Sequence, residues 1–430
     1  MHGPSYTLAT PENPPDAAKL FALVHKPLAE AAGLMETLND DLKNLGSGWH
    51  CELEEEAYEN TYSRVTPLRL TYQDVPSRPA IGVSSLLDLL KGHGEHASAD
   101  PALVGSPGYK PGALTRGDFG RVPVKIVAQG PPRSERSARG GRRPIVALLD
   151  TAVQPHPWLG PSDPDLTGAG FWVDARRLGW HPGPRLTPSS SPVTEGPHGR
   201  ELGDQEGHGT FCAGLIRQIA PDARVLAVEV MNDDGMVYGD HVLNGLGWLV
   251  DLHVPDRRSV VLEKGDVVCL PFGFRPIWPM DKTYVGWLGD VLGELGQRGV
   301  LVVAAAGNDG EDDPIYPAAF AASAAYPETR LVSVGALNSN GRTRAEYSNY
   351  GFWVSDWEVG TSVVSTFPKV DGAVRPELAW DNGRESADPD DFTGGFARWS
   401  GTSFAAAIYA GRYAQRKAVA ASDAAENERA

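Results

Sequence analysis

The sequence predicts an α/β protein: a three-layer α/β/α domain on a mainly parallel sheet, with a smaller α+β domain at the N-terminus. Short, unbroken apolar runs carry this prediction, because strands that read as continuous hydrophobic segments are buried on both faces. They lie at 145–149, 225–230, 266–270, 300–306 and 331–334. Helical stretches separate them, at 210–219, 241–252, 284–297 and 317–324. Strands that alternate with helices in this way form a parallel sheet covered on both sides.

The N-terminal third of the chain has a different pattern. Apolar residues at helical spacing over 16–45, interrupted by Pro27, predict one kinked helix or two short ones. Strand-like pieces follow at 65–72 and 122–127, with a helix at 84–90. Residues 131–143 are polar, basic and rich in Pro and Gly, which is typical of a linker. We therefore expect an N-terminal domain at 1–130, a linker at 131–143, the α/β domain at 144–420 and a disordered tail at 421–430.

Composition excludes some classes of protein. With 41% hydrophobic residues, the chain of 430 residues can bury a substantial core. A net charge of −16 argues against nucleic acid and anionic membranes as partners, because both attract basic surfaces. The N-terminus lacks a basic start followed by an apolar core, and no apolar run nears the roughly 20 residues that span a bilayer. The cysteines Cys51, Cys212 and Cys269 are odd in number and widely spaced, so we expect reduced thiols and a cytoplasmic location.

A Gly-Thr-Ser turn near the C-terminus directs attention to Ser403. Residues 401–403 lead into an alanine-rich run that predicts a helix to about 417. A serine in the first turn of a helix lies beside unpaired backbone N–H groups and the positive end of the helix dipole, which favour an oxyanion. The simpler interpretation is a helix N-cap. Other residues must decide between the two.

Three further side chains stand where chemistry is expected. Asp150 ends a buried strand, where an isolated carboxylate is costly and needs a partner. His208 has glycines on both sides, which allow other backbone to approach the imidazole closely. Asn308 follows a strand of small residues and offers a side-chain amide donor. Asp150 and Asn308 both fall at the carboxyl ends of strands, where parallel sheets form their sites. Each of these residues also has a purely structural interpretation.

Taken together, the order Asp, His, Asn, Ser resembles the subtilisin-like serine proteases (the subtilase or peptidase S8 family). The resemblance covers most of residues 144–416. Its motifs are Asp150-Thr151-Ala152-Val153, Gly207-His208-Gly209-Thr210, Ala305-Ala306-Gly307-Asn308 and Ser400-Gly401-Thr402-Ser403-Phe404-Ala405.

The resemblance implies a role for each residue. Ser403 would be the nucleophile, His208 the general base, and Asp150 the group that orients the imidazole. Asn308 and the Ser403 backbone N–H would stabilise the oxyanion. Two segments would flank a peptide or protein substrate bound as an added strand. Their residues are Leu270, Pro271, Phe272, Gly273, Ala304, Ala305 and Ala306.

The chain departs from the family pattern in several places. Ala152 and Pro271 stand where the family usually has glycine and serine, and Ala407 replaces a proline. Residues 160–203 form a long insertion rich in Pro, Gly and Ser, which we expect to be a loop near the cleft. The chemistry requires no cofactor and no metal in the site. Some subtilases bind structural calcium, but the spacing of the acidic residues in the insertion supports no specific site.

Function and the role of the N-terminal region leave alternatives open. A serine endopeptidase with a restricted range of substrates is the expected function. The alternatives are a catalytically silent pseudo-protease that binds peptides, and an acyl-transfer ligase or macrocyclase on the same triad. Residues 1–130 are either an inhibitory prosegment cut in the arginine-rich linker or a retained domain that recognises a partner protein. From sequence we favour the second.

Overall fold

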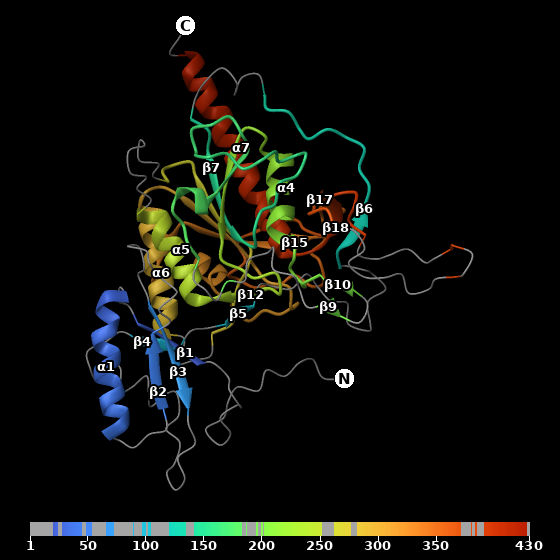
Figure 1. Ribbon diagram of the computed structural model, residues 1–430. Helices are drawn as coiled ribbons and strands as arrows, with labels where there is room; N and C mark the ends of the chain where they lie inside the picture. The colour runs from blue at the N-terminus through green and yellow to red at the C-terminus, as the bar shows by residue number, and fades with distance from the viewer. Residues whose placement is uncertain are drawn as a thin grey trace.

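The structure of the protein is a computed structural model (Figure 1). It describes residues 20–24, 28–44, 49–53, 66–72, 89, 97–99, 102–104, 120–134, 142–182, 186, 195–196, 199–200, 202–251, 262–276, 282–370, 380, 383–384 and 391–427. The predicted helix at 84–90, apart from residue 89, and the middle of the predicted linker lie outside this set.

Within the described residues, the central sheet has seven strands, all parallel, in the order β16-β15-β14-β13-β7-β11-β8. Their bounds are β7 (Ile145–Asp150), β8 (Trp172–Asp174), β11 (Arg224–Glu229), β13 (Val267–Leu270), β14 (Leu301–Ala305), β15 (Leu331–Leu337) and β16 (Asp356–Val359). All five apolar runs are therefore strands of one parallel sheet, as predicted.

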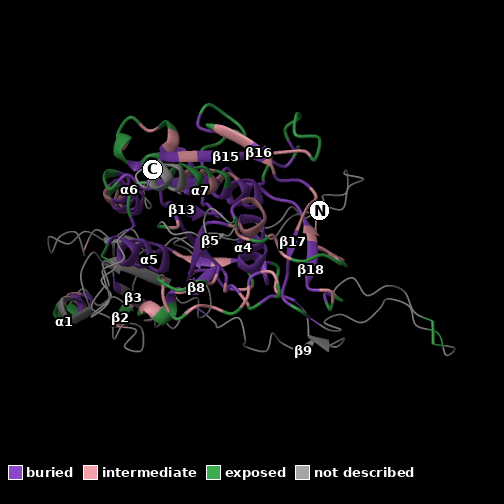
Figure 2. Cartoon of the chain, turned by 90° about the horizontal axis from the view of Figure 1, so that it is seen from above, coloured by how far each residue is buried: buried purple, intermediate pink, exposed green. Residues whose placement is uncertain are grey.

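Helices cover both faces of this sheet, which gives the three-layer α/β/α architecture (Figure 1). They are α4 (His208–Ile219), α5 (Gly239–Asp251), α6 (Lys282–Gln297) and α7 (Thr402–Asn427). Alternate residues of a strand point to opposite faces. Ile145, Ala147 and Leu149 of β7 pack in the apolar cluster of α5 and α6, whereas Val146 and Leu148 pack in that of α4 and α7. Figure 2 shows that most of the central sheet and of the helices beside it is buried, whereas the edge strand β16 is mainly intermediate.

The N-terminal region forms a smaller α+β unit, also as predicted. Its antiparallel sheet has the order β2-β3-β1-β4. The elements are β1 (Leu20–Val24), α1 (Leu28–Asn44), β2 (Trp49–Leu53), β3 (Thr66–Tyr72) and β4 (Ala97–Ala99). The side-chain amide of Asn39 on α1 donates to the backbone carbonyl of Cys51 on β2 and accepts from its N–H, at 2.8 Å each. β4 lies against α6 of the larger domain, below which the unit sits in Figure 1.

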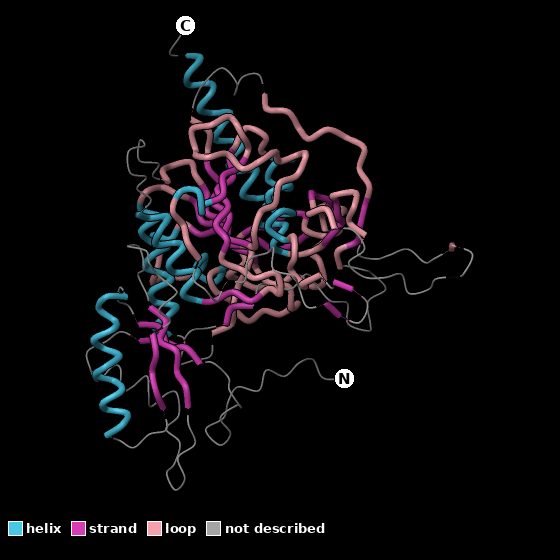
Figure 3. Tube along the Cα trace, viewed as in Figure 1, coloured by secondary structure: helices cyan, strands magenta, loops and turns pink. Residues whose placement is uncertain are grey.

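Two short strands join the N-terminal part of the chain to the larger domain. β5 (Ala102–Val104) pairs antiparallel with β12 (Met236–Tyr238). β6 (Val122–Val124) is the edge strand of a three-stranded antiparallel sheet with β18 (Phe396–Trp399) and β17 (Val363–Thr366). A two-stranded hairpin, β9 (Glu195–Gly196) with β10 (Gly199–Arg200), lies in the insertion. The strands and helices can be followed along the trace in Figure 3.

The segment at 120–134 contacts the larger domain at several points along its length. Ser134 donates from its backbone N–H and its hydroxyl to the carboxylate of Asp222, at 2.9 Å each. The indole N–H of Trp158 donates to the carbonyl of Ala128 at 3.0 Å. The domain limits at 130 and 143 remain predictions, but β6 and these contacts associate residues 120–134 with the larger domain.

Four local predictions are wrong. Residues 20–24 are not helical, because their partners β3 and β4 supply backbone hydrogen bonds that local periodicity cannot reveal. The predicted helix at 317–324 is a short 3₁₀-helix, η3 (Ala318–Ala322). The insertion is not simply a loop, since β8 extends the central sheet at its edge. Helix α7 continues to Asn427, into the predicted tail, because the alanine-rich sequence there favours helix.

Candidate active site

Asp150 and His208 form a buried pair at the carboxyl edge of the central sheet. Asp150 ends β7 and His208 begins α4. The imidazole Nδ1 lies 2.8 Å from Asp150 Oδ1 and 3.0 Å from Oδ2, and the Thr151 backbone N–H also donates to Oδ1. Both side chains are at most 2% exposed. Because a carboxylate only accepts, the Nδ1 carries the proton, which leaves Nε2 as the basic nitrogen.

The glycines beside His208 are required by close packing, as the sequence indicated. Gly207 has φ +81°, and a Cβ there would lie 2.6 Å from the ring of Phe367. A Cβ on Gly209 would lie 2.2 Å from the carbonyl oxygen of Thr151. Any side chain at either position would therefore displace His208 or the strand end that carries Asp150. Ala152, the departure near this turn, is not among the described residues with positive φ, so it carries no such strain.

Aromatic rings and one arginine support the histidine from behind. The His208 ring packs against Trp399 and Phe404, with centroids at 5.6 and 5.3 Å. The Arg121 guanidinium lies over the Trp399 ring at 5.7 Å. It also donates to the carbonyls of Leu202, Gly203 and Glu206, in the loop just before His208, at 2.7–3.3 Å. Nothing in the sequence singled out Arg121, because its partners are about 80 residues away in the chain.

Ser403 and Asn308 lie together on the other side of the site. Thr402 begins α7, and its N–H and hydroxyl donate to Asn308 Oδ1 at 2.8 and 2.9 Å. The Thr402 hydroxyl in turn accepts from the N–H of Gly307 at 3.0 Å. These bonds fix the Asn308 amide, whose Nδ2 lies 3.6 Å from where a Cβ on Gly401 would stand. Ser403, in the first turn of the helix, is 1% exposed.

The hydroxyl of Ser403 donates to the carbonyl oxygen of Pro271 at 2.8 Å. In the part of the chain that the structure describes, this carbonyl, and not His208, is its hydrogen-bond acceptor. The substitution of proline for the usual serine at this position thus leaves intact the group that contacts the nucleophile. The structure brings Asp150 to His208 and Ser403 to Pro271, but the hydrogen bond between the two pairs is not made.

The residues expected to flank a substrate follow the ends of two paired strands. Leu270 ends β13 opposite Ala304 of β14. Beyond this pair, both segments approach Ile315, whose Cδ1 lies 2.6 Å from where a Cβ on Gly273 would stand and 2.8 Å from where one on Gly307 would stand. All seven expected residues are buried. Whether a substrate lies between the segments remains a prediction.

The thiol of Cys212 lies 3.8 Å from His208 Nδ1. Among the described residues, Asp150, His208 and Cys212 are the group of potential metal ligands that lie within 4.8 Å of one another. Burial, and then the negative charge of Asp150, raise the pKa of Cys212 well above its usual value, so the thiol is neutral. All three cysteines of the chain are buried free thiols. A thiol and an imidazole are poor ligands for calcium, which prefers oxygen, so this group supports no calcium site.

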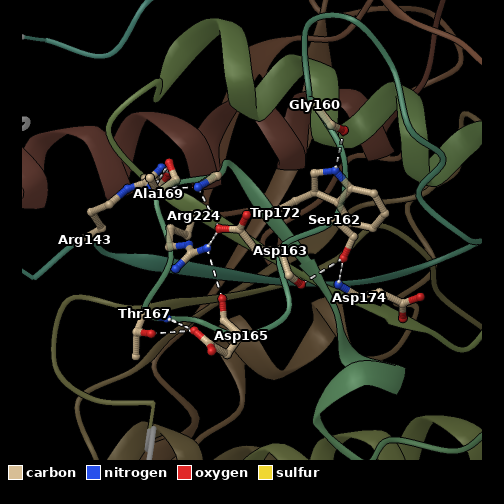
Figure 4. Close-up of polar contacts among 12 residues, drawn as sticks. Arg143, Gly160, Ser162, Asp163, Asp165, Thr167, Ala169, Trp172, Asp174 and Arg224 are labelled. Carbon is tan, nitrogen blue, oxygen red and sulfur yellow. Dashed lines mark hydrogen bonds and ion pairs between the residues drawn. The ribbon is translucent and has the colours of Figure 1, made fainter.

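Asp163 and Asp165 of the insertion are held by protein groups (Figure 4). Asp163 pairs with the buried Arg224 and accepts from the N–H of Gly170 at 2.7 Å. Asp165 accepts from the N–H of Thr167 at 2.8 Å. These carboxylates stabilise turns leading to β8, which explains their presence without a cation. Calcium binding remains untested.

None of the helices in the described part of the chain has the length and apolar character of a membrane span. The larger domain has a three-layer α/β/α fold, and it carries a buried Asp–His pair and a serine at a helix N-terminus. These features make the protein a candidate serine hydrolase. A model of the subtilase family (Peptidase S8) matches residues 141–430. The chain therefore belongs to the subtilase family, whose members are subtilisin-like serine proteases.

Individual relatives agree with this assignment. Subtilisin BL from Lederbergia lenta is 28% identical over 258 residues, which cover 57% of this chain and 75% of the relative. Subtilisin-like protease 2 from Pseudogymnoascus destructans is 32% identical over 168 residues, 38% of this chain and 36% of the relative. The chain thus spans little more than a third of the length of some curated relatives it matches. Among solved structures, a lanthipeptide protease matches with TM-score 0.43 and 19% identity, over 68% of this chain and 78% of that one.

Proposed function

We propose that the protein is a serine endopeptidase that hydrolyses peptide bonds through Asp150, His208 and Ser403, with Asn308 as an oxyanion donor. The observation that carries the proposal is the buried hydrogen bond between Asp150 and His208 Nδ1 at 2.8 Å. This hydrogen bond leaves Nε2 of His208 as the base, at the carboxyl edge of the central sheet, where Ser403 and Asn308 also lie. A purely structural histidine would have no need of this arrangement of four groups.

The reaction follows from these positions. Ser403 Oγ attacks the carbonyl carbon of the substrate while its proton passes to His208 Nε2, and Asp150 stabilises the imidazolium. The developing oxyanion accepts hydrogen bonds from Asn308 Nδ2 and the Ser403 N–H, at the positive end of α7. Collapse of the intermediate breaks the C–N bond, and His208 protonates the leaving amine. Water then attacks the acyl-enzyme by the same route and regenerates Ser403.

The bond from Ser403 to Pro271 defines the resting state in this account. Before attack, the hydroxyl has to turn from the Pro271 carbonyl towards His208 Nε2. A substrate bound as an extended strand would present main-chain N–H groups along Leu270–Gly273. One of these can replace the serine as the donor to Pro271, so that substrate binding itself would release the nucleophile to its base.

The pairing of β5 with β12 supports the first of the two N-terminal hypotheses, an inhibitory prosegment, rather than the one the sequence favoured. β12 lies beside the site: Val230 and Met231, which lead into its hairpin, donate to the carbonyl of Asp150 at 2.9 and 3.3 Å. A free strand edge there is where an extended peptide would add. β5 occupies that edge in the way a bound peptide would.

We propose a cut before the arginine-rich linker and not within it. Arg121 holds the loop before His208, and β6 pairs with β18, which leads to Ser403. These residues are needed after release, so we propose self-cleavage between Val104 and Gly120. Intact mass spectrometry tests this. Wild type should lose a fragment ending in that interval, while Ser403→Ala keeps its full length. A cut within 131–143, or an active enzyme of full length, would instead support the linker site or the retained partner-binding domain.

Hydrolysis itself is tested with an unstructured protein substrate and product masses. Each cleavage should add the mass of one water across the two products. Products joined to an added amine without that gain would support the acyl-transfer alternative. Binding without any product would support the pseudo-protease. Ser403→Ala should release no product. A cytoplasmic location rests on the sequence argument alone and is tested by cell fractionation.

A further inference from the structure

The direction of the Asn308 amide depends on the backbone of this residue as well as on its side chain. Thr402 holds the side chain, because its N–H and its hydroxyl both donate to Asn308 Oδ1. The backbone contributes through φ and ψ, its two soft dihedral angles. These angles are set by the peptide group before Asn308 and the peptide group after it. A residue that holds both peptide groups would therefore aim the amide.

A single residue, Asn349, holds both of these peptide groups. Its backbone N–H donates at 2.9 Å to the carbonyl of Gly307, which belongs to the peptide group before Asn308. Its side-chain Oδ1 accepts at 2.9 Å from the N–H of Asp309, which belongs to the peptide group after Asn308. The same oxygen accepts from the N–H of Glu311 at 3.2 Å. Asn349 is fully buried, so its side-chain oxygen is shielded from bulk water.

Asn349 is itself fixed in place and lies close against Gly307. Its carbonyl accepts from the hydroxyl of Ser348 at 3.0 Å, and this hydroxyl accepts from the N–H of Ala336 on β15, also at 3.0 Å. β15 pairs with β14, the strand that leads to Gly307. A Cβ on Gly307, which has φ +98°, would lie 2.4 Å from Asn349 Nδ2. The glycine therefore allows a close approach of Asn349, whose own position is tied to the sheet.

We propose that Asn349 is a positioning residue, which holds the backbone on both sides of Asn308 and so aims its amide at the oxyanion. This inference rests on the proposed endopeptidase function. The side-chain oxygen of Asn349 is the group that matters, because its Nδ2 has no hydrogen-bond acceptor among the described residues. An asparagine with a purely structural role would also stabilise this loop, but its loss would not act through Asn308. Dependence on Asn308 thus distinguishes the two roles.

Two substitutions test the role of the oxygen. Asn349→Leu is similar in shape but has no acceptor. We expect it to lower kcat by about 10–100-fold with little change in KM, as when a catalytic group is misplaced by about 1 Å. Asn349→Asp keeps an oxygen for the two N–H groups and should retain most of kcat. Each variant is assayed below its own melting temperature with a chromogenic peptide substrate.

Asn338→Leu is the matched control, because it makes the same chemical change in the turn after β15. The Asn338 side chain donates to the hydroxyl of Thr343 at 3.0 Å and to the carbonyl of Arg344 at 3.1 Å. Its loss should lower the melting temperature, since hydrogen bonds are removed, and leave kcat close to that of wild type. A loss of kcat as large as that of Asn349→Leu would overturn the inference.

The decisive measurement repeats Asn349→Leu in a chain that already carries Asn308→Ala. Residues that act as a unit have non-additive effects. Once the Asn308 amide is absent, Asn349→Leu should therefore cause little further loss of kcat. An equal loss in both backgrounds would overturn the inference, and so would an Asn349→Asp variant as impaired as Asn349→Leu. If Asn349→Leu does not fold, Asn349→Asp decides: retained kcat supports the role of the oxygen, and a large loss overturns it.

Failure of this inference differs from failure of the proposed function. If Asn308→Ala lowers kcat and Asn349→Leu does not, the positioning role alone fails. If wild type neither hydrolyses peptides nor reacts with a fluorophosphonate at Ser403, the function fails and this inference with it.

Discussion

The two sides of the active site differ in how far they are assembled. On the base side, the carboxylate of Asp150 and the imidazole of His208 are already hydrogen bonded. The imidazole packs against Trp399, and the Arg121 guanidinium lies over the Trp399 ring. On the nucleophile side, Asn308 is fixed by Thr402, but the Ser403 hydroxyl donates to Pro271. The base His208 and the oxyanion donor Asn308 are therefore already oriented, whereas the Ser403 hydroxyl still has to turn towards His208.

The difference indicates which interactions the fold provides and which the substrate must complete. The base side is built from a strand end and a helix start in the core, where packing alone fixes the geometry. The nucleophile side is where the proposed substrate would bind. Substitutions on the two sides should therefore differ in their effects on kcat, KM and stability, and loss of the nucleophile should have the largest effect of all.

Ser403→Ala should lower kcat by about 10⁶-fold, the magnitude found when the nucleophile of subtilisin is removed. Compared at the same chain length, the melting temperature should stay close to that of wild type, because only one hydroxyl bonded to Pro271 is lost. Ser400→Ala is the control: it removes a nearby buried hydroxyl, which accepts from the N–H of Ser362. Kinetic assays with both variants measure this. Substantial turnover by Ser403→Ala would refute the assignment of the nucleophile.

Asp150→Asn should lower kcat by about 10⁴-fold, because an amide cannot stabilise the imidazolium and favours the wrong tautomer. The KM should change little, since Asp150 lies behind His208 and away from the expected substrate. Steady-state kinetics with a chromogenic peptide substrate would show this. A loss of only a few-fold would mean that His208 does not depend on the carboxylate for its orientation.

Asn308→Ala should lower kcat by about 10²–10³-fold, with a smaller change in KM, because its amide donates to the oxyanion only as that charge develops. Thr402→Ser keeps the hydroxyl bonded to Asn308 and is the matched control. It should retain most of the activity. If Asn308→Ala raised KM and left kcat unchanged, the amide would bind the ground state and not the transition state.

Arg121→Ala should have the smallest catalytic effect, together with a loss of about 1–3 kcal/mol in the free energy of unfolding, because several carbonyls before His208 lose their donor. Arg121→Lys keeps the charge but lacks the planar fork that reaches several carbonyls, so it should recover only part of the loss. Thermal unfolding and the pH profile of kcat/KM would be measured together. A lower melting temperature with an unchanged profile would limit Arg121 to a structural role.

The central sheet could be predicted from sequence because its information is local. Each of its inner strands is a continuous apolar run, and Asp150 and Asn308 end or follow such runs. The flanking glycines of His208 also indicated close packing correctly. Edge strands carry a weaker signal: β8 was missed inside a Pro- and Gly-rich insertion, and β16 contains Asp356 and Glu358.

Other features could not be predicted because they depend on distant partners. Leu20–Val24 has helical spacing, yet pairing with β3 and β4 makes it a strand. Arg121 acts on a loop about 80 residues away. The Ser403 bond to Pro271 depends on the relative placement of α7 and β13.

Peptide mapping after reaction with a fluorophosphonate tests most directly whether Ser403 is an activated nucleophile. The reagent forms a stable adduct only with a serine activated by a base and an oxyanion site. Leu103→Pro, which places a proline at the middle of the three β5 residues that pair with β12, should be measured beside wild type. We expect one adduct per chain, on the peptide containing Ser403, and none in Ser403→Ala. No adduct on Ser403 in either wild type or Leu103→Pro would contradict this expectation.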